Sequence, residues 1–179
     1  LTDEQGARRV RLGVEAAGVE DGMAWSTWHP WPDVRVDTVL WGGAPSHGRL
    51  HRVRSDRELH TEETGFALGH DPDDYARLRG RRSAEVSTAW GRSSISDVGG
   101  TRRQTVRALP GNANLMYPQT VVPMLTCRLE AGDHQLACIV EASPVASTVE
   151  TAQASLAVPD VARQLLARIS EREIPEVTP

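Results

Sequence analysis

Two imidazoles and a guanidinium recur at alternate positions of one segment, at His47, Arg49 and His51. Successive side chains of a β-strand point to opposite faces, so these three would share one face, with the imidazoles about 7 Å apart. Such a row could bind an acidic group of a ligand or partner domain through the fork of Arg49, or supply a general acid or base. The plainer reading is a solvated strand face, or a polar face buried against another domain.

A zinc site is a further use of the two histidines, with Glu62 or Glu63 as a third ligand. The spacing H-x-x-x-H is a zinc signature on a helix, where residues i and i+4 meet, but it is weak evidence on a strand. We therefore predict no metal and no cofactor.

A second polar row follows at His60, Glu62 and Thr64. If its strand pairs with the first row's strand, Glu62 would face that row in an ion-paired cross-strand ladder. Glu63 would then point to the other face.

Aromatic residues gather just before these rows, in the segment Trp28-His29-Pro30-Trp31-Pro32. On a proline-stiffened loop, Trp28, His29 and Trp31 could form a platform for the apolar faces of sugar rings. The alternative, which we favour, is that these tryptophans pack as ordinary core.

The sequence shows no complete catalytic set. It lacks a glycine-rich phosphate loop, a nucleophile elbow and a C-x-x-C pair. A net charge of −4 argues against a dedicated nucleic-acid-binding protein. The arginines at 77, 79, 81 and 82 follow three aspartates, and we expect the two groups to neutralise each other.

Period-two alternation dominates the chain and predicts many short strands separated by turns. The expected strands cover residues 10–16, 34–40, 47–54, 59–68, 84–90 and 101–109. Together with little helix, this pattern predicts a mostly β fold, an antiparallel β-sandwich with one or two short helices.

The clearest expected hairpin spans residues 121–141 and turns at Gly132-Asp133. A two-residue loop would pair Cys127 with Cys138 and Leu129 with Leu136, all on the core face. The paired cysteines fall on a hydrogen-bonded site with poor disulfide geometry, so we predict free thiols.

Two helices are expected. Asp71-Pro72-Asp73-Asp74 is a typical helix start, for a helix ending near Gly80. Pro159-Asp160 would open a second helix to Ile169, with Val161, Leu165, Leu166 and Ile169 on one side. We expect a single domain over residues 1–170 and a loose tail over 171–179.

Two stretches of the sequence carry a resemblance to a known family. They are Trp41-Gly42-Gly43-Ala44-Pro45-Ser46-His47-Gly48-Arg49-Leu50-His51-Arg52-Val53 and Glu62-Glu63-Thr64-Gly65-Phe66-Ala67. Together they resemble the C-terminal β-sandwich of a bacterial family named only as a domain of unknown function. In that family a helical toroid precedes the sandwich, similar to heparinase-like and alginate-lyase-like polysaccharide lyases. The resemblance implies a parent enzyme that acts on glycans, with most catalytic groups in the toroid.

We therefore expect an accessory β-sandwich of a carbohydrate-active enzyme, lyase-like or glycosidase-like, that is not itself catalytic. Its partners would be the N-terminal helical toroid of the same parent chain and an acidic glycan as candidate ligand. Two alternatives stay open: an independent carbohydrate-binding module, and a purely structural interaction domain. No apolar run approaches the roughly 18–20 residues of a membrane span, so we expect a soluble protein, with the cytoplasm favoured.

Overall fold

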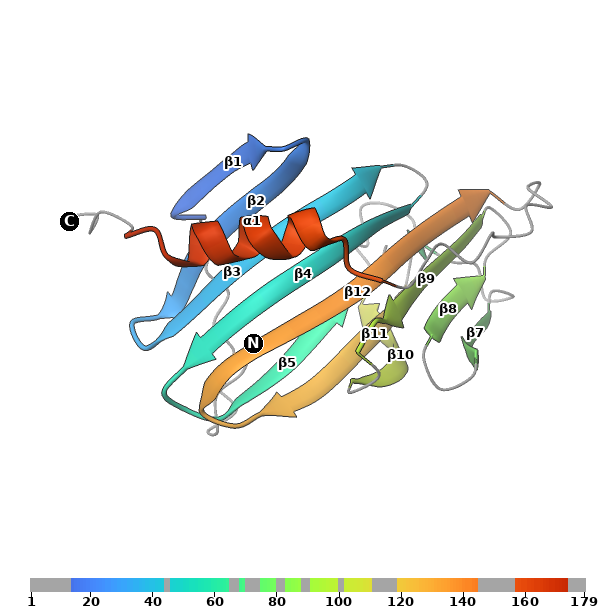
Figure 1. The fold of residues 1–179 in the computed structure, drawn as a ribbon. Coiled ribbons are helices and arrows are strands. Elements are labelled where there is room, and N and C mark those ends of the chain that lie inside the picture. The colour runs from blue at the N-terminus through green and yellow to red at the C-terminus, as the bar shows by residue number, and fades with distance from the viewer. Residues whose placement is uncertain are drawn as a thin grey trace.

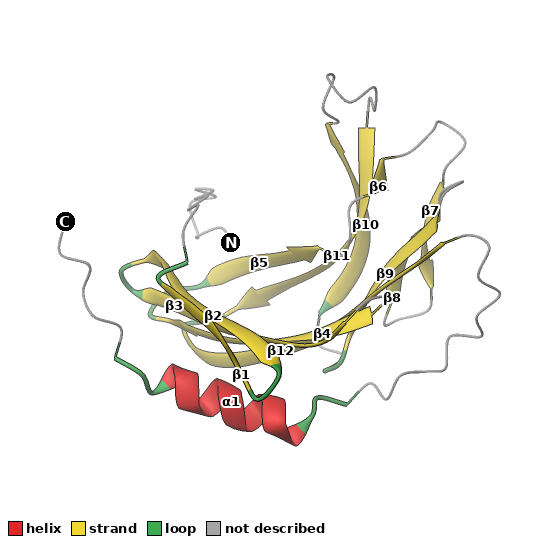
Figure 2. Ribbon diagram, turned by 90° about the horizontal axis from the view of Figure 1, so that it is seen from above, coloured by secondary structure: helices red, strands yellow, loops and turns green. Residues whose placement is uncertain are grey.

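The structure is a computed structural model that describes residues 14–43, 46–64, 68–69, 75–79, 83–87, 91–99, 102–110, 119–144 and 157–173. Two antiparallel sheets face each other, and one helix lies against the outside of the larger sheet (Figures 1 and 2). The mostly β, sandwich-type fold predicted from the sequence is confirmed.

The larger sheet has eight strands in the order β1-β2-β3-β4-β12-β9-β8-β7. Their bounds are β1 (Ala16–Glu20), β2 (Met23–Trp31), β3 (Val34–Gly43), β4 (Ser46–Ser55), β12 (Gly132–Pro144), β9 (Gly91–Asp97), β8 (Ser83–Ser87) and β7 (Tyr75–Arg79). The smaller sheet runs β10-β11-β5, from β10 (Arg103–Pro110), β11 (Gln119–Leu129) and β5 (Leu59–Thr64), and β6 (Leu68–Gly69) also pairs with β11.

The expected strands at 34–40 and 47–54 are confirmed as β3 and β4, which pair antiparallel with each other. The strand expected at 10–16 falls almost wholly outside the described residues. The proline-stiffened tryptophan segment is a strand, β2, and not a loop. A register shift between Trp28 and Trp31 accommodates Pro30, which cannot donate to the ladder.

The expected hairpin at 121–141 is wrong in its pairing. β11 pairs with β10 and β5, whereas β12 pairs with β4 and β9, so the chain passes from one sheet to the other at the turn. Leu129 and Leu136 are buried together in one cluster, and Leu125 and Cys138 in another. The residues of β11 and β12 expected in the core are therefore in the core. They face each other from opposite sheets and do not lie side by side in one sheet. Cys127 and Cys138 are free thiols, as predicted.

The helix expected at 71–80 is also wrong, because residues Tyr75–Arg79 form strand β7, paired with β8. The alternation of Tyr75, Arg77 and Arg79 with Ala76 and Leu78 suits a strand, and sheet pairing overrides the local helix-start signal. Residues 70–74 and 80 lie outside the described residues.

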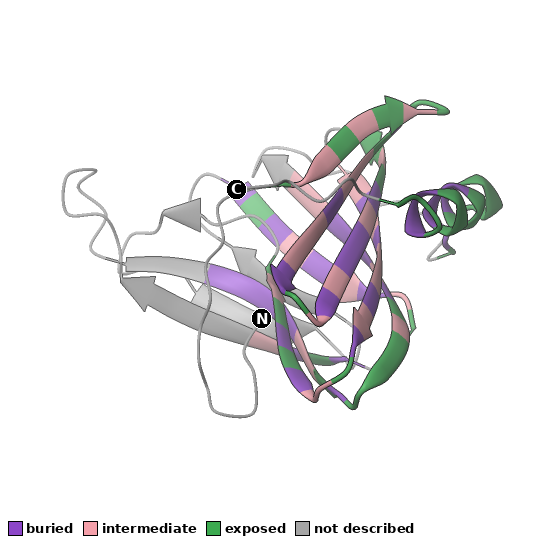
Figure 3. Ribbon diagram, turned by 90° about the vertical axis from the view of Figure 1, so that its left-hand side faces the viewer, coloured by how far each residue is buried: buried purple, intermediate pink, exposed green. Residues whose placement is uncertain are grey.

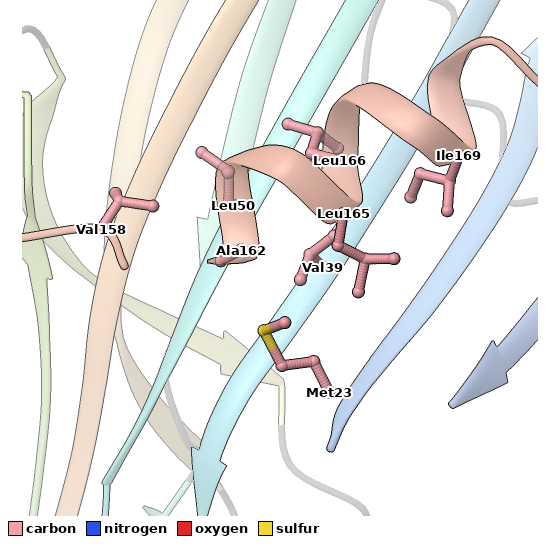
Figure 4. Close-up of a cluster of buried hydrophobic side chains, with 8 residues drawn as sticks. All are labelled: Met23, Val39, Leu50, Val158, Ala162, Leu165, Leu166 and Ile169. Carbon is pink, nitrogen blue, oxygen red and sulfur yellow. The ribbon is translucent and has the colours of Figure 1, made fainter. Parts of the chain in front are cut away.

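The C-terminal helix is confirmed as α1 (Asp160–Ser170). Ala162, Leu165, Leu166 and Ile169 are buried against the outer face of the large sheet, where they meet Met23, Val39 and Leu50 (Figure 4). Val161 was expected on this side, but its side chain is 48% exposed. At 3.6 residues per turn, Val161 lies about a quarter of a turn around the helix from the centre of the buried stripe, so the helix's contact face is narrower than the sequence implied.

The C-terminal end of α1 is held by a buried carboxylate and two arginines of the sheet. Asp37 accepts hydrogen bonds from Arg35 Nε at 3.0 Å and from Arg54 NH2 at 3.3 Å. The two guanidinium groups also donate to the last carbonyls of the helix, Arg35 to Ile169 at 2.8 Å and Arg54 to Ser170 at 2.8 Å. Cations at a helix C-terminus satisfy carbonyls that have no partner within the helix.

The inner face of β3 is buried where the strand begins and more exposed toward its end. Along the inner face of β3, exposure rises from 0% at Val34 and 5% at Val36 to 37% at Leu40. Figure 3 shows the accompanying alternation of buried and less buried residues along the strands. We call the region around Leu40, Arg49 and His47 the open end of the sandwich. Leu40 pairs with Arg49 across the sheet, and His47 lies two residues before Arg49 on β4.

Candidate functional site

The polar row predicted on one strand face is present on β4. His47, Arg49 and His51 are half-buried on the inner face, where they face the smaller sheet. β4 lies between β3 and β12 and is therefore a central strand. The row does not lie on an exposed edge strand. The opposite face of β4 has core character as well, because Leu50 is buried under α1.

Glu63, from β5 of the facing sheet, is the acidic partner of this row. His51 Nε2 lies 2.9 Å from Glu63 Oε1, and Arg49 NH1 lies 3.6 Å from the same oxygen. The expectation that Glu62 would face the row is wrong. β5 pairs with β11 and not with β4, so its core-facing residues Leu59, Thr61 and Glu63 point across the sandwich to the row.

Arg102 completes the network behind Glu63. Its side chain is 1% exposed; it forms an ion pair with Glu63 Oε2 and donates from Nε to Asp97 Oδ1 at 2.7 Å. It also donates from NH2 to the carbonyl of Ala137 at 2.6 Å. Buried charges are tolerated when they are paired and hydrogen-bonded, as they are here. The network joins both sheets.

Burial and neighbouring charges shift two pKa values in this network in opposite directions. Burial alone would raise the pKa of Glu63, but the charge and hydrogen bond of His51, with the charge of Arg102, hold it well below its usual range. Burial, and then the charge of Glu63, raise the pKa of the Cys138 thiol, which donates to Glu63 Oε1 at 3.0 Å. Glu63 is therefore ionised and Cys138 is an unreactive thiol at neutral pH.

Toward the open end, Arg49 joins the row to the rim of β5. It donates from NH1 to the carbonyl of Thr64 at 2.9 Å and from Nε to His47 Nε2 at 3.0 Å. Burial lowers the pKa of His47, and the charge of Arg49 lowers it further. His47 is thus a neutral acceptor at neutral pH, and the row carries less positive charge than its residue types suggested.

A cavity of about 180 Å³ lies beside the network between the two sheets. Its lining combines an aromatic ring and aliphatic side chains with acidic and basic groups: Trp28, Val36, His51, Val53, Thr61, Glu62, Glu63, Arg102 and Leu136. The structure thus brings Trp28, His51 and Glu62, all singled out from the sequence, to one cavity. Arg102 was missed; nothing in its local sequence distinguishes it from the other arginines.

The remaining predicted site residues lie elsewhere. Trp31 is only 8% exposed and packs in the core, with the Arg57 guanidinium 5.9 Å from its ring centroid. His29 Nδ1 is 2.5 Å from Glu15 Oε2, away from the cavity lining. A platform of exposed Trp28 and Trp31 is therefore absent. Gly48, between His47 and Arg49, is covered by the Trp41 indole, because a Cβ there would lie 2.0 Å from that ring.

Thr38, His51 and Glu63 form an array that the sequence could not reveal. Thr38 Oγ1 lies 2.9 Å from His51 Nδ1, while Nε2 of the same ring faces Glu63. This hydroxyl–imidazole–carboxylate order resembles a nucleophile with its base and orienting acid. Thr38, however, lies mid-strand between β2 and β4, where sheet pairing occupies the backbone N–H groups that an oxyanion hole would need. The array supports acid–base chemistry at His51 more readily than nucleophilic attack.

Within the described ranges, no group of three or more His, Cys, Asp or Glu side chains is arranged to hold a metal ion. The helix in the same part of the chain is too short to cross a bilayer.

The fold is a two-sheet antiparallel β-sandwich with a polar network between its sheets. The chain belongs to the DUF2264 C-terminal domain family, whose model matches residues 1–158. No curated protein matches the chain.

Among solved structures, the chain is similar to a heparan sulfate lyase HepC mutant from Pedobacter heparinus, with 10% identity and a TM-score of 0.51 over 74% of this chain and 22% of that one. A putative kojibiose phosphorylase from human microbiome matches with 12% identity and a TM-score of 0.38, over 85% and 21% of the two chains. The chain thus spans about a fifth of the length of these structures, and the first similarity concerns the fold alone.

Proposed function

We propose that this chain is a non-catalytic accessory β-sandwich of a carbohydrate-active enzyme. Its open end packs on a helical toroid domain of the same parent chain and forms one wall of the substrate cleft. The observation that carries this proposal is the half-buried polar row of Arg49 and His51, which ends at the open rim beside the exposed side chain of Leu40.

Three features support this function. The chain spans about a fifth of the heparan sulfate lyase that shares its fold, which is consistent with one domain of a larger parent. Its cavity, about 180 Å³, is smaller than the roughly 300–1,000 Å³ of sites that enclose a whole ligand. The Thr38–His51–Glu63 array lies in a central part of the sheet without an oxyanion hole. A domain that forms one wall of a cleft needs neither a cavity that encloses a whole ligand nor an oxyanion hole.

The alternative of an independent carbohydrate-binding module requires Trp28 and Trp31 as an exposed aromatic platform. The burial of Trp31 argues against this alternative. A purely structural interaction domain differs from our proposal in one respect: it predicts no effect of the polar row on turnover by the parent enzyme. This difference can be tested by substitution at the rim.

Arg49→Ala should be made in the full-length parent and in the 179-residue chain. We expect a small change in the melting temperature of the isolated chain, and weaker activity or looser domain docking in the parent. The isolated chain should show no turnover of any polysaccharide. Full activity and an unchanged melting profile of the Arg49→Ala parent would contradict the proposal, as would lyase or hydrolase activity of the isolated chain.

A further inference from the structure

The inner face of the larger sheet is only partly covered by the smaller sheet. β10 and β11 lie against β7, β8 and β9, and Glu63 of β5 reaches His51 on β4. The described strands of the smaller sheet leave β1 and the adjoining part of β2 uncovered (Figure 1). In the described part of the chain, the larger sheet thus has no second layer over this edge.

Three apolar side chains form a row across the uncovered area. Val19 of β1 pairs with Ala24 of β2, and Ala24 pairs with Leu40 of β3. Leu40 pairs in turn with Arg49, which faces the smaller sheet, and directly opposite residues of antiparallel strands share a face. Val19 is 77% exposed and Leu40 37% exposed, and Ala24 is exposed as well. We call Val19, Ala24 and Leu40 the apolar row. Apolar side chains exposed next to one another, unlike scattered ones, indicate an interaction surface.

The apolar row has the shape of a shallow trough. The methyl group of Ala24 lies between the larger side chains of Val19 and Leu40, and the next pair along the strands, Ala17 and Ser26, is also small. Val19 and Leu40 are two strand spacings apart, roughly 10 Å. An α-helix with its side chains is about 10–12 Å wide. One helix lying along β2 therefore fits between the two rims.

The charged groups that border the apolar row already have partners. Glu20 and Asp21, at the turn after β1, bind Arg168 at 2.9 Å and 2.5 Å. At the other end, Arg49 donates to the carbonyl of Thr64 at 2.9 Å. A partner need not supply a counter-charge here. The contact is therefore apolar, as expected of the core of an interface, where charged residues are depleted.

The order of elements along the chain indicates which partner lies nearest. β1 is the first described element and also the edge strand of the uncovered area. The helical toroid proposed above precedes the sandwich in the parent chain, so it is connected to the sandwich at this edge. An amphipathic helix of that domain presents an apolar stripe of the kind that the trough accepts.

We propose that one amphipathic helix of the toroid domain packs along β2, with its apolar side chains between Val19 and Leu40. The inference deepens the proposed function and rests on it, because it specifies which surface and which kind of element form the contact. The helix lies on the same side of the larger sheet as the smaller sheet and supplies the missing part of the second layer. Arg49 and His51 then border the contact, where they line the cleft.

The test is the reactivity of a cysteine placed on the apolar row. Val19→Cys is made in the 179-residue chain and in the full-length parent, and its rate of reaction with a small maleimide is measured after subtracting the rate of the unsubstituted protein. The rate should be about tenfold or more lower in the parent, because the helix covers the thiol. Val161→Cys is the matched control: it is an exposed valine on α1, which lies on the other side of the larger sheet (Figure 2), and it should react equally in both proteins.

A second substitution tests the trough itself. Ala24→Trp fills the floor, so it should displace the helix and restore the fast reaction of Val19→Cys in the parent. Because Ala24 is exposed, the melting temperature of the isolated chain should change little. Ala167→Trp makes the same change at an exposed position of α1 and should leave Val19→Cys protected in the parent.

Equal rates for Val19→Cys in the chain and in the parent overturn the proposal, as does protection that survives Ala24→Trp. A strand added at the edge of β1 would leave the face of Val19 reactive in the parent. A slow reaction of the isolated chain that becomes faster on dilution would assign the surface to a second copy of the chain. If Arg49→Ala lowers the activity of the parent while Val19→Cys stays reactive, the cleft-wall function is retained and only this contact is lost.

Discussion

At the residue scale, Glu63 links the two sheets by accepting from His51 on β4, from Cys138 on β12 and from the buried Arg102. No pair of these groups is adjacent in the sequence. Local alternation predicted the correct parity, with Leu59, Thr61 and Glu63 on one face, but we expected that face to point away from the row. Which sheet a strand joins depends on its pairing with strands that are distant in the sequence. Local alternation of polar and apolar residues does not specify those partners.

Glu63→Gln should destabilise the chain by about 3 kcal/mol at neutral pH, because it leaves the buried Arg102 with one carboxylate in place of two. The folded-state pKa of Glu63 is depressed, so its stabilisation is complete above its usual value near 4.5 and is lost as the pH falls toward the folded-state value. Urea unfolding at pH 7 and pH 3 should therefore show a smaller difference between wild type and variant at pH 3.

Glu62→Gln is the control for this comparison, since Glu62 is exposed and the substitution is chemically the same. It should change the free energy of unfolding by less than about 0.5 kcal/mol at either pH. If the difference in free energy of unfolding between wild type and Glu63→Gln stayed constant or grew on acidification, the network would not be lowering the pKa of Glu63.

At the scale of elements, the C-terminal helix was predictable because its start signal and apolar spacing agree with each other. Its contact face was only partly predictable: Leu165, Leu166 and Ile169 are buried, but Val161 is not. The rotation of α1 on the sheet is set by its partners, including the two arginines that bind its last carbonyls. These partners lie more than a hundred residues away in the sequence.

Leu165→Ala should lower the free energy of unfolding by about 2–5 kcal/mol, because the side chain is fully buried between α1 and the sheet. Val161→Ala, on the exposed side of the same helix, should change it by less than about 0.5 kcal/mol. Chemical denaturation of the two variants in parallel measures both values. Equal losses would mean that the helix sits on the sheet in a different rotation.

Leu129→Asp should prevent folding, because it places an unpaired charge in the cluster that Leu129 shares with Leu136 across the sandwich. Gln135→Asp introduces the same residue at an exposed position next to Arg52 on the neighbouring strand, and it should fold normally. Circular dichroism and thermal melts distinguish the two. A cooperative, unshifted melt of Leu129→Asp would show that the core face has been assigned backwards.

At the scale of the whole molecule, alternation and turns predicted the fold class, and the family resemblance anticipated the C-terminal domain family. The connection between β11 and β12 could not be predicted. A short turn between two alternating segments suits a hairpin within one sheet and an arch between two sheets equally, because both place the same residues in the core. The choice is made by β4, β5, β9 and β10, which supply the partners for the two strands.

The same argument explains why the candidate site was only partly predictable. The row of His47, Arg49 and His51 follows from the period of one strand and is confirmed as a shared face. The cavity depends on Trp28, Glu63 and Arg102, which come from separate elements and meet only after both sheets have formed. A sequence pattern can indicate a face, whereas a cavity requires the relative position of two faces.

The central claim, that the open end packs on another domain of the parent, is tested most directly by amide hydrogen exchange. Exchange in the 179-residue chain should be compared with exchange in the full-length parent. We predict additional protection in the parent at the open end, in residues 40–43 and 46–49, with unchanged exchange in α1 (Asp160–Ser170). Equal protection of the open end in both proteins, or new protection confined to α1, would contradict the account.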